Sequence, residues 1–294
     1  MKVSIEPGKY VIAVSGGVDS TVLLDVLARQ HKVELVIAHF DHSIRKDSVE
    51  DRLLVQVLAD KYGLPFVFNE LKLGSNVSEA KAREKRYEFL RSVQKQYQAK
   101  GIITAHHQDD VLETAVLNLL RGTNRRGLSS LKSTASTKRP LLDVPKSEII
   151  DYAKSHNLKW REDSTNLDDK YLRNYIRHQI LPHFKSEHRQ QLLTILSQAK
   201  QINQKIDDEL SQIFLNGEGS RLDRQWFLKL PHATAKDIMA AWLRYNNVRN
   251  INRSSLDRLV VAAKTLPPSK TRHVDVNYNL KITKKYLALL PSDR

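Results

Sequence analysis

Residues 10–20 read YVIAVSGGVDS, an apolar run followed by a turn with two adjacent glycines. The apolar run predicts a buried strand, and a helix is expected from Ser20 to about Gln30. Glycines at the turn allow a sharp bend and leave the backbone N–H groups unobstructed. Because the following helix presents the positive end of its dipole, this turn is predicted to bind an anion such as phosphate. The alternative is an ordinary glycine turn whose last serine caps the helix.

The glycine turn ends in Asp19-Ser20, where a Walker A loop would end in Lys-Ser or Lys-Thr. The sequence therefore argues against a typical NTPase that transfers the γ-phosphate. Asp19 could hold Mg²⁺ or accept a proton, because a carboxylate beside phosphates commonly binds a hard cation.

Short apolar runs alternate with longer amphipathic stretches through the first two-thirds of the chain. This alternation predicts βαβ units, and hence an α/β fold with a doubly wound parallel sheet covered on both faces. Strands are expected at residues 10–14, 33–39, 65–68 and 101–105, and helices at 20–30, 48–62, 77–97 and 107–120.

The alternation stops after about residue 190. We therefore expect a catalytic domain at 1–190 and a smaller, mostly helical domain at 191–294, for which a role in substrate recognition is expected. Helices are predicted at 191–214, 235–244 and 255–264, and an alternating tail at 273–290 predicts a terminal hairpin.

Composition narrows the classes of function. Among the 294 residues, Lys and Arg number 48 against 33 Asp and Glu, a net charge of +15. Such a surplus favours a nucleic-acid partner, although a basic surface that binds nothing is the alternative. Cysteine is absent, which excludes disulfides, zinc-thiolate sites, iron–sulfur clusters and cysteine nucleophiles supplied by this chain. Since no signal peptide or membrane-spanning run is present, a cytoplasmic protein without membrane contact is expected.

The stretch HHQDDVLET, residues 106–114, follows the fourth predicted strand and enters a helix. His106, Asp110 and Glu113 are spaced to share one helix face. Ligands bind at the carboxyl ends of parallel strands, where this stretch and the glycine turn both lie. These side chains could bind a metal ion or an ammonium group, or accept a proton; a solvated helix start is the alternative.

Several arginines are candidates for contacts with phosphate. Arg83 and Arg86 are expected on the same side as Tyr87, where they could offset charge on a phosphate. Arg173 and Arg177 lie one turn apart and could meet a phosphate, or could form an internal salt bridge with Asp163. A polar segment at 122–138 is predicted to be a loop or a mobile segment, and three arginines in or beside it are Arg121, Arg125 and Arg126.

Taken in order, these segments resemble the tRNA(Ile)-lysidine synthetases, a family of PP-loop N-type ATP pyrophosphatases. The resemblance covers the first two-thirds of the chain and weakens after residue 191. Its motifs are SGGVDS at 15–20, AHFDHSIR at 38–45, EAKAREKRY at 79–87, HHQDDVLET at 106–114, LLRGTNRRGL at 119–128, RPLL at 139–142, and DSTN with RNYIRHQILP between 163 and 182.

The resemblance implies two chemical steps. The O2 atom of the wobble cytidine of tRNA(Ile), in a CAU anticodon, attacks the α-phosphorus of ATP and releases pyrophosphate. The amine of free L-lysine then displaces AMP from C2 to give lysidine. It implies ATP and Mg²⁺ as cofactors; a homodimer is left open.

Roles for individual residues also follow from the resemblance. ATP would contact Ser15, Gly16, Gly17, Val18, Asp19, Ser20, His39 and Phe40. The catalytic set would be Asp19, Arg83, Arg86, His106 and Asp110, with Mg²⁺ on Asp19 and Asp110. Lysine would bind Asp110 and Glu113, and tRNA would bind Arg121, Arg125, Arg126, Arg173 and Arg177.

Alternative functions remain. A tRNA thiolase would adenylate a base similarly, but such enzymes commonly pass sulfur through cysteines. The excess of basic residues fits an amidotransferase-type ligase such as NAD or GMP synthetase, which acts on a small substrate, less well than an enzyme that acts on RNA. A non-enzymatic RNA-binding module leaves SGGVDS and HHQDDVLET unexplained. Many members of the family continue into a further C-terminal tRNA-binding domain, so a natural short form and a truncated protein are both expected readings of an end at Arg294.

Overall fold

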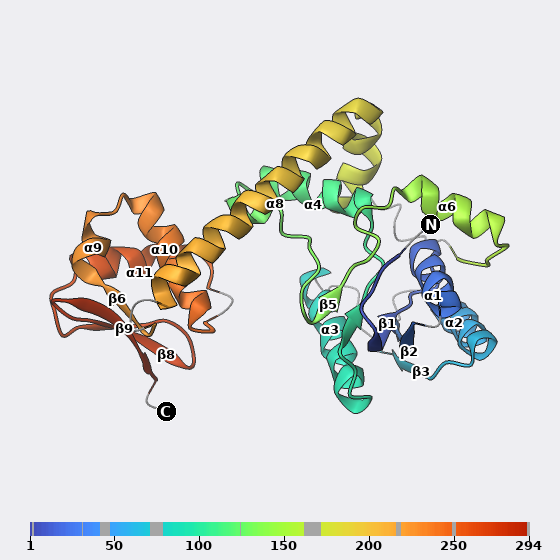
Figure 1. Cartoon of the computed structure of the whole chain (residues 1–294), viewed down its shortest axis with the longest axis horizontal. Helices are drawn as coiled ribbons and strands as arrows, with labels where there is room; N and C mark the ends of the chain where they lie inside the picture. Colours follow the sequence, from blue (N-terminus) through green and yellow to red (C-terminus); the bar gives the residue numbers. More distant parts are fainter. Residues whose placement is uncertain are drawn as a thin grey trace. The chain divides into compact units, whose positions relative to one another are not determined.

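The computed structural model describes residues 1, 3–30, 32–41, 48–70, 79–123, 125–161, 172–215, 219–248 and 251–292. The chain divides into two compact units, Met1–Ala199 and Lys200–Arg294. The boundary expected at residue 190 lies inside α8, Ser186–Leu215, a helix that runs from the first unit into the second (Figure 1).

Unit 1 is built on a five-stranded parallel sheet in the order β3-β2-β1-β4-β5. On one side of β1 the strands follow in chain order, with β2 paired to β1 and β3 paired to β2. On the other side β4 pairs with β1, and β5 pairs with β4. This reversal places a crevice between the carboxyl ends of β1 and β4, the usual ligand position in such sheets. The strands are β1 Gly8–Ala13, β2 Val33–Asp41, β3 Phe66–Glu70, β4 Gly101–Ile103 and β5 Thr137–Lys138.

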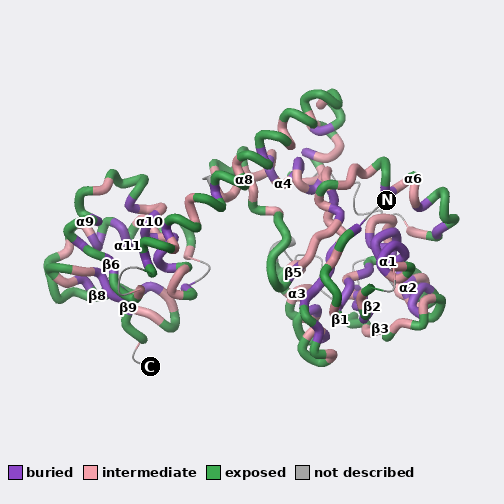
Figure 2. The backbone as a smooth tube through the Cα atoms, viewed as in Figure 1, coloured by how far each residue is buried: buried purple, intermediate pink, exposed green. Residues whose placement is uncertain are grey.

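Helices cover both faces of the sheet, which confirms the expected doubly wound fold. Tyr10 and Ile12 pack with side chains of α1, α2 and α6, whereas Val11 packs with α3 on the opposite face. Successive strand residues point to opposite faces, so a strand buried on both sides reads as a continuous apolar run. Buried residues are concentrated in α1 and the central strands (Figure 2). The helices of unit 1 before α8 are α1 Val18–Gln30, α2 Ser48–Tyr62, α3 Glu79–Gln96, α4 Gln108–Leu120, α5 Arg125–Leu128, α6 Lys146–Ser155, α7 Leu172–Tyr175, the π-helical turn η2 Ile176–Ile180 and the short turn η3 Leu181–His183.

One buried carboxylate ties three helices on the same face of the sheet. Asp25 of α1 accepts hydrogen bonds from Arg29 Nε at 2.7 Å, from Tyr152 Oη of α6 at 2.8 Å and from Tyr62 Oη of α2. Burial raises the pKa of Asp25, but these hydrogen bonds outweigh it and hold the pKa below its ordinary value. The same burial, with the bond to Asp25, raises the pKa of Tyr152 to about 12. The cluster fixes α1, and with it the glycine turn at the start of α1.

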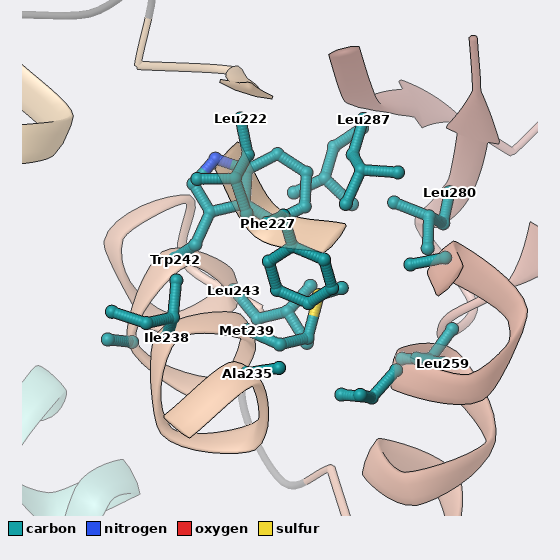
Figure 3. Packing of buried hydrophobic residues seen from close by; sticks show 14 of the residues in the cluster. Leu222, Phe227, Ala235, Ile238, Met239, Trp242, Leu243, Leu259, Leu280 and Leu287 are labelled. Atoms are coloured by element: carbon teal, nitrogen blue, oxygen red, sulfur yellow. The ribbon is translucent and has the colours of Figure 1, made fainter. Parts of the chain in front are cut away.

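Unit 2 has a core of its own between helices and a small antiparallel sheet. Trp242 and Phe227 are fully buried at its centre (Figure 3), and Trp242 Nε1 donates to the carbonyl of Gly219 at 3.0 Å. The buried Arg224 donates to the carbonyls of Ala263 and Leu266 at the end of α11, and to the carbonyl of Thr283 between β8 and β9. The helices are α9 Arg224–Lys229, α10 His232–Tyr245 and α11 Arg253–Thr265.

The C-terminal tail forms more than the hairpin expected from its alternation. Strands β8, Tyr278–Ile282, and β9, Tyr286–Pro291, do form a hairpin. Two three-residue strands extend it to the order β6-β9-β8-β7, namely β6 Arg221–Asp223 and β7 Thr271–His273. Strands this short carry no recognisable period, which is why the sequence did not predict them.

Among the helices of the described residues, none combines the length and the apolar character needed to cross a bilayer.

Candidate active site

The glycine turn closes on itself through two serine hydroxyls. Ser20 Oγ donates to the Gly17 carbonyl at 3.0 Å and accepts from the Ser15 N–H at 3.1 Å. Ser15 Oγ lies 3.1 Å from Ser20 Oγ and accepts from the Gly17 N–H at 3.4 Å. Gly16 has φ +91°, a conformation that favours glycine. The turn at the start of α1 is therefore a fixed bend of the kind that binds anions.

A residue far along the chain pairs with the aspartate of this turn. Lys146 Nζ lies 2.5 Å from Asp19 Oδ1, and Lys146 opens α6 directly after Pro145. A cation in the first turn of a helix opposes the helix dipole, so its position requires another explanation. The pair puts an ammonium group beside the anion-binding turn. Sequence reasoning did not select Lys146, although its unfavourable place in the helix was a usable signal.

His107 brings the end of β4 to the same carboxylate. Its Nδ1 accepts from the Asp109 N–H at 3.2 Å, which assigns the proton of a neutral ring to Nε2. Nε2 lies 3.8 Å from Asp19 Oδ1 and 3.7 Å from Asp110 Oδ2. The side chains that follow β1 and β4 therefore meet at the crevice between these strands.

Asp110 and Glu113 lie together on one face of α4, whereas His106, predicted to share that face, precedes the helix. Both carboxylates contact arginines. Arg173 donates to Asp110 Oδ1 at 3.1 Å and to Glu113 Oε2 at 3.0 Å. Arg177 donates to the two oxygens of Glu113 at 2.6 Å and 2.9 Å. The second oxygen of Asp110 accepts from the His107 N–H at 2.9 Å. Glu113 is 1% exposed, so this ion pair is built into the interior of unit 1.

These contacts explain the shifted pKa values at this end of the site. Burial raises the pKa of Asp110, but His107, His106 and Arg173 outweigh it and lower that pKa. For Arg177, burial is opposed by Glu113 and Asp110, which raise its pKa. The sequence predicted, as one alternative, an internal salt bridge between Asp163 and Arg173 or Arg177. In the structure both arginines pair with Glu113 and Asp110, and Asp163 lies outside the described residues.

His106 lies beside a group of positive charges. Its Nδ1 is 2.9 Å from Thr104 Oγ1. Burial is the main reason that its pKa is lowered to about 3; Asp110 opposes the shift, while Arg139, Arg83 and Arg86 add to it. The guanidinium carbons of Arg83 and Arg86 lie 5.0 Å and 5.8 Å from the centre of the Tyr87 ring, so the expected clustering on one side of α3 is seen.

His39 and Phe40, expected to contact ATP, lie at the carboxyl end of β2. His39 is 3% exposed, and its Nδ1 bonds to the Val14 carbonyl at 2.9 Å, so it supports the residue before the glycine turn. Burial lowers the pKa of His39, which favours the neutral ring. Phe40 packs against Phe89 of α3, with ring centres 5.7 Å apart.

The basic segment after α4 is folded back onto that helix. Asn118 Nδ2 donates to the Gly127 carbonyl at 2.7 Å and to Ser130 Oγ at 3.0 Å. Arg121 is exposed at the end of α4 and Arg126 is half-buried in α5. The side chain of Arg125 lies outside the described residues.

Arg161 also supports the glycine turn, and the sequence did not single it out. Its backbone N–H donates to the Gly16 carbonyl at 3.0 Å, and its Nε donates to Asp51 Oδ1 of α2 at 2.8 Å. Its Nη1 pairs with Glu50. Arg161 and Asp51 are 110 positions apart in the sequence, so a local sequence pattern cannot predict this contact.

Comparison with known proteins assigns this arrangement to a family. The PP-loop domain family matches residues 2–184. The tRNA(Ile)-lysidine synthase of Nitrosomonas europaea is 31% identical across 100% of this chain and 68% of its own length. That of Persephonella marina is 32% identical across 94% of this chain and 64% of its own length. That of Thermotoga maritima is 39% identical over 60% of this chain and 46% of its own length. The chain thus spans between about half and two-thirds of the length of these relatives.

A solved structure supports the fold alone. The U34-tRNA thiolase NcsA from Methanococcus maripaludis, determined with its [4Fe-4S] cluster, has a TM-score of 0.57 and 18% sequence identity, covering 67% of this chain and 73% of that one. Together, the glycine turn at the β1–β4 crevice, the matched PP-loop domain and the similarity to these synthases lead to one assignment: the chain belongs to the PP-loop enzymes, in the tRNA(Ile)-lysidine synthase family.

Proposed function

We propose that this chain uses ATP to join the side-chain amine of free lysine to C2 of the wobble cytidine in an isoleucine tRNA with a CAU anticodon. AMP and pyrophosphate would be released. The observation that carries the proposal is the meeting of Asp19, Lys146 and His107 beside the glycine turn, at the crevice between β1 and β4. The names of the similar proteins indicate the RNA and the product.

The glycine turn and Lys146 would hold the outgoing pyrophosphate. Backbone N–H groups and the positive end of α1 attract phosphoryl oxygens. Lys146 Nζ, at 2.5 Å from Asp19, would reach the same oxygens and offset their charge. With the outer two phosphates held this way, the α-phosphorus would be left open to attack by O2 of the cytidine.

Mg²⁺ fits this site as a cation that arrives with ATP. Among the described residues, no group of three or more histidine, cysteine, aspartate or glutamate side chains is arranged to hold a metal. Mg²⁺ usually binds through one or two carboxylates together with substrate phosphates and water, so the protein need supply only one or two ligands. Asp19 supplies such a carboxylate beside the turn, whereas the oxygens of Asp110 already accept from His107 and Arg173. We therefore propose Asp19 as the main ligand; the bound ion would neutralise charge that develops on the phosphates.

Charge at the α-phosphate would be offset by Arg83 and Arg86, whose guanidinium groups gather at Tyr87 near His106. Donors fixed in place before the reaction stabilise developing charge without reorganising during it. The nearby basic segment, with Arg121 and Arg126, would contact the RNA backbone. Unit 2 would add further contacts to the tRNA.

Lysine must lose a proton before its side-chain amine can attack, since the pKa of that group is about 10.4 in water. We propose Asp110 as the carboxylate that pairs with an ammonium group of lysine, and the proton would be lost to water. With a pKa near 3, His106 is neutral at pH 7 and is a weak base, so a hydrogen-bonding role suits it better than proton removal. Glu113 would support this site by holding Arg173 and Arg177.

The rival functions make different demands. A thiolase of the kind that passes sulfur through cysteine would need residues that this chain lacks. A module that only binds RNA would release no pyrophosphate.

The test is incorporation of labelled lysine into RNA. The protein is incubated with ATP, labelled lysine and isoleucine tRNA bearing a CAU anticodon, and a tRNA with a GAU anticodon serves as the control. Label is expected only in the CAU tRNA and only with ATP. Labelling of both RNAs alike, or labelling without ATP, would contradict the proposal.

A further inference from the structure

The glycine turn runs close beside the first turn of α2, which carries two carboxylates. A Cβ atom added at Gly16 would lie 3.6 Å from the Cβ of Asp51. Glu50 and Asp51 both belong to the first turn of that helix, where acidic side chains complement the helix dipole. The side chain of Asp51 is 11% exposed, so water screens its charge poorly. Negative charge beside a turn that is expected to bind phosphates opposes that binding.

Arg161 places a positive charge on both carboxylates. Its Nε donates to Asp51 Oδ1 at 2.8 Å, and its Nη1 donates to Glu50. A guanidinium group has several donors in a fixed fork, so it can meet two carboxylates at once. The backbone N–H of Arg161 donates to the Gly16 carbonyl at 3.0 Å. Because that backbone bond survives a change of side chain, the charge of Arg161 can be removed while its direct bond to the turn stays in place.

We propose that the side chain of Arg161 raises the affinity of the glycine turn for the phosphates of ATP by offsetting the charge of Asp51 and Glu50. The inference rests on the proposed function, since it concerns the ATP site of that reaction. The three side chains carry one positive and two negative charges, a net charge of −1. Arg161 acts on the nucleotide through this charge and does not need to touch it, so it is a positioning residue.

A purely structural role for the ion pair predicts a different order of affinities. If the contact between Arg161 and Asp51 only braces the turn, Arg161→Gln and Asp51→Asn both break it, and both weaken the binding of ATP. If the charge matters, the two changes act in opposite directions. Arg161→Gln leaves a net charge of −2 on the three side chains, whereas Asp51→Asn leaves a net charge of zero.

The experiment measures the Kd for ATP by calorimetry, with Mg²⁺ and without tRNA or lysine. Arg161→Gln should raise this Kd about 5- to 20-fold, the effect of one unit charge about 10 Å from a phosphate group at an effective dielectric constant of about 20. Asp51→Asn should leave the Kd equal to or below that of the wild type. The double variant Arg161→Gln with Asp51→Asn restores the net charge of −1, so its Kd should return to within about threefold of the wild-type value. Arg161→Lys keeps the charge and should also stay within about threefold.

Two controls accompany these variants. Lys100→Gln removes a positive charge from the ion pair with Glu6, just before the amino end of β4, and should leave the Kd for ATP unchanged. In tRNA-dependent pyrophosphate release, the KM for ATP of Arg161→Gln should rise with the Kd, while kcat at saturating ATP should change by less than about twofold. The melting temperature shows whether each variant is folded; if Arg161→Gln is not, the direction of the Asp51→Asn effect decides.

Weaker binding of ATP in Asp51→Asn overturns the inference, as does a double variant that binds ATP as weakly as Arg161→Gln. An Arg161→Gln protein with the wild-type Kd overturns it as well. All three results leave the proposed function in place. Failure of the wild type to bind ATP overturns the proposed function, and this inference with it.

Discussion

Glu113 is the residue whose substitution separates two explanations of the site most clearly. Its side chain is 1% exposed and accepts from Arg173 Nε at 3.0 Å, from Arg177 Nε at 2.6 Å and from Arg177 Nη2 at 2.9 Å. If Glu113 anchors the arginines, the change Glu113→Gln removes a buried charge that three donors require. If Glu113 binds lysine instead, the same change mainly weakens lysine binding.

The magnitude follows from burial. Removing one member of a buried ion pair costs about 3 to 5 kcal/mol, because the partner charges are left without compensation. Unit 1 spans 199 residues. For a domain of this size each kcal/mol lowers the melting temperature by roughly 2–4 °C, so a drop of about 6–20 °C is expected.

Thermal unfolding at pH 7 measures this effect. The matched control is Glu148→Gln, an exposed glutamate in the first turn of α6, which should change the melting temperature by less than about 2 °C. In a double-mutant cycle, Glu113→Gln combined with Arg177→Gln should cost less than the sum of the single changes, because the shared interaction is lost only once. A Glu113→Gln protein as stable as the wild type, with a KM for lysine raised about tenfold, would refute the anchoring role.

Three other outcomes are expected. Asp19→Ala should keep the melting temperature within about 3 °C of the wild type, because its ion pair is partly exposed, yet abolish tRNA-dependent pyrophosphate release; near-normal release would remove Asp19 from the mechanism. Replacing Arg121 and Arg126 together by glutamine should weaken tRNA binding and reduce the slope of log K against log salt by roughly 0.7 to 0.9 for each lost phosphate contact; an unchanged slope would mean that this segment faces elsewhere. Asp25→Asn should lower the free energy of unfolding by about 1.5 to 3 kcal/mol at pH 7. Because the folded pKa of Asp25 lies below its ordinary value of 3.8, this stabilisation is present above pH 3.8 and is lost as the pH falls below it. The free energies of unfolding of the wild type and Asp25→Asn should therefore converge in acid. A constant difference between them down to pH 2 would mean that the negative charge of Asp25 does not stabilise the fold.

The parallel sheet and the glycine turn could be predicted because their signals are local. The apolar run before Ser15 and the helix at 48–62 are read from residues close together in the sequence, and the helix bounds match α2. These features depend on period and turn chemistry, which act over a few residues.

The partners of the site residues could not be predicted in the same way. Lys146 meets Asp19 across 127 positions, and Arg161 meets Asp51 across 110. The spacing of Arg173 and Arg177 placed them on one side of a helix, but it did not show that Glu113 faces them. The division between the units has no local signal for a different reason: α8 carries one continuous helical pattern through both units, so no turn marks the division.

The central claim is that this chain cleaves ATP between the α and β phosphates while an RNA base is activated. The direct measurement separates the products of ATP labelled in the α position, after incubation with lysine and isoleucine tRNA. The expected result is labelled AMP, with pyrophosphate in equal amount, formed only when the tRNA is present. Accumulation of labelled ADP, which reports cleavage at the γ-phosphate, would contradict the account.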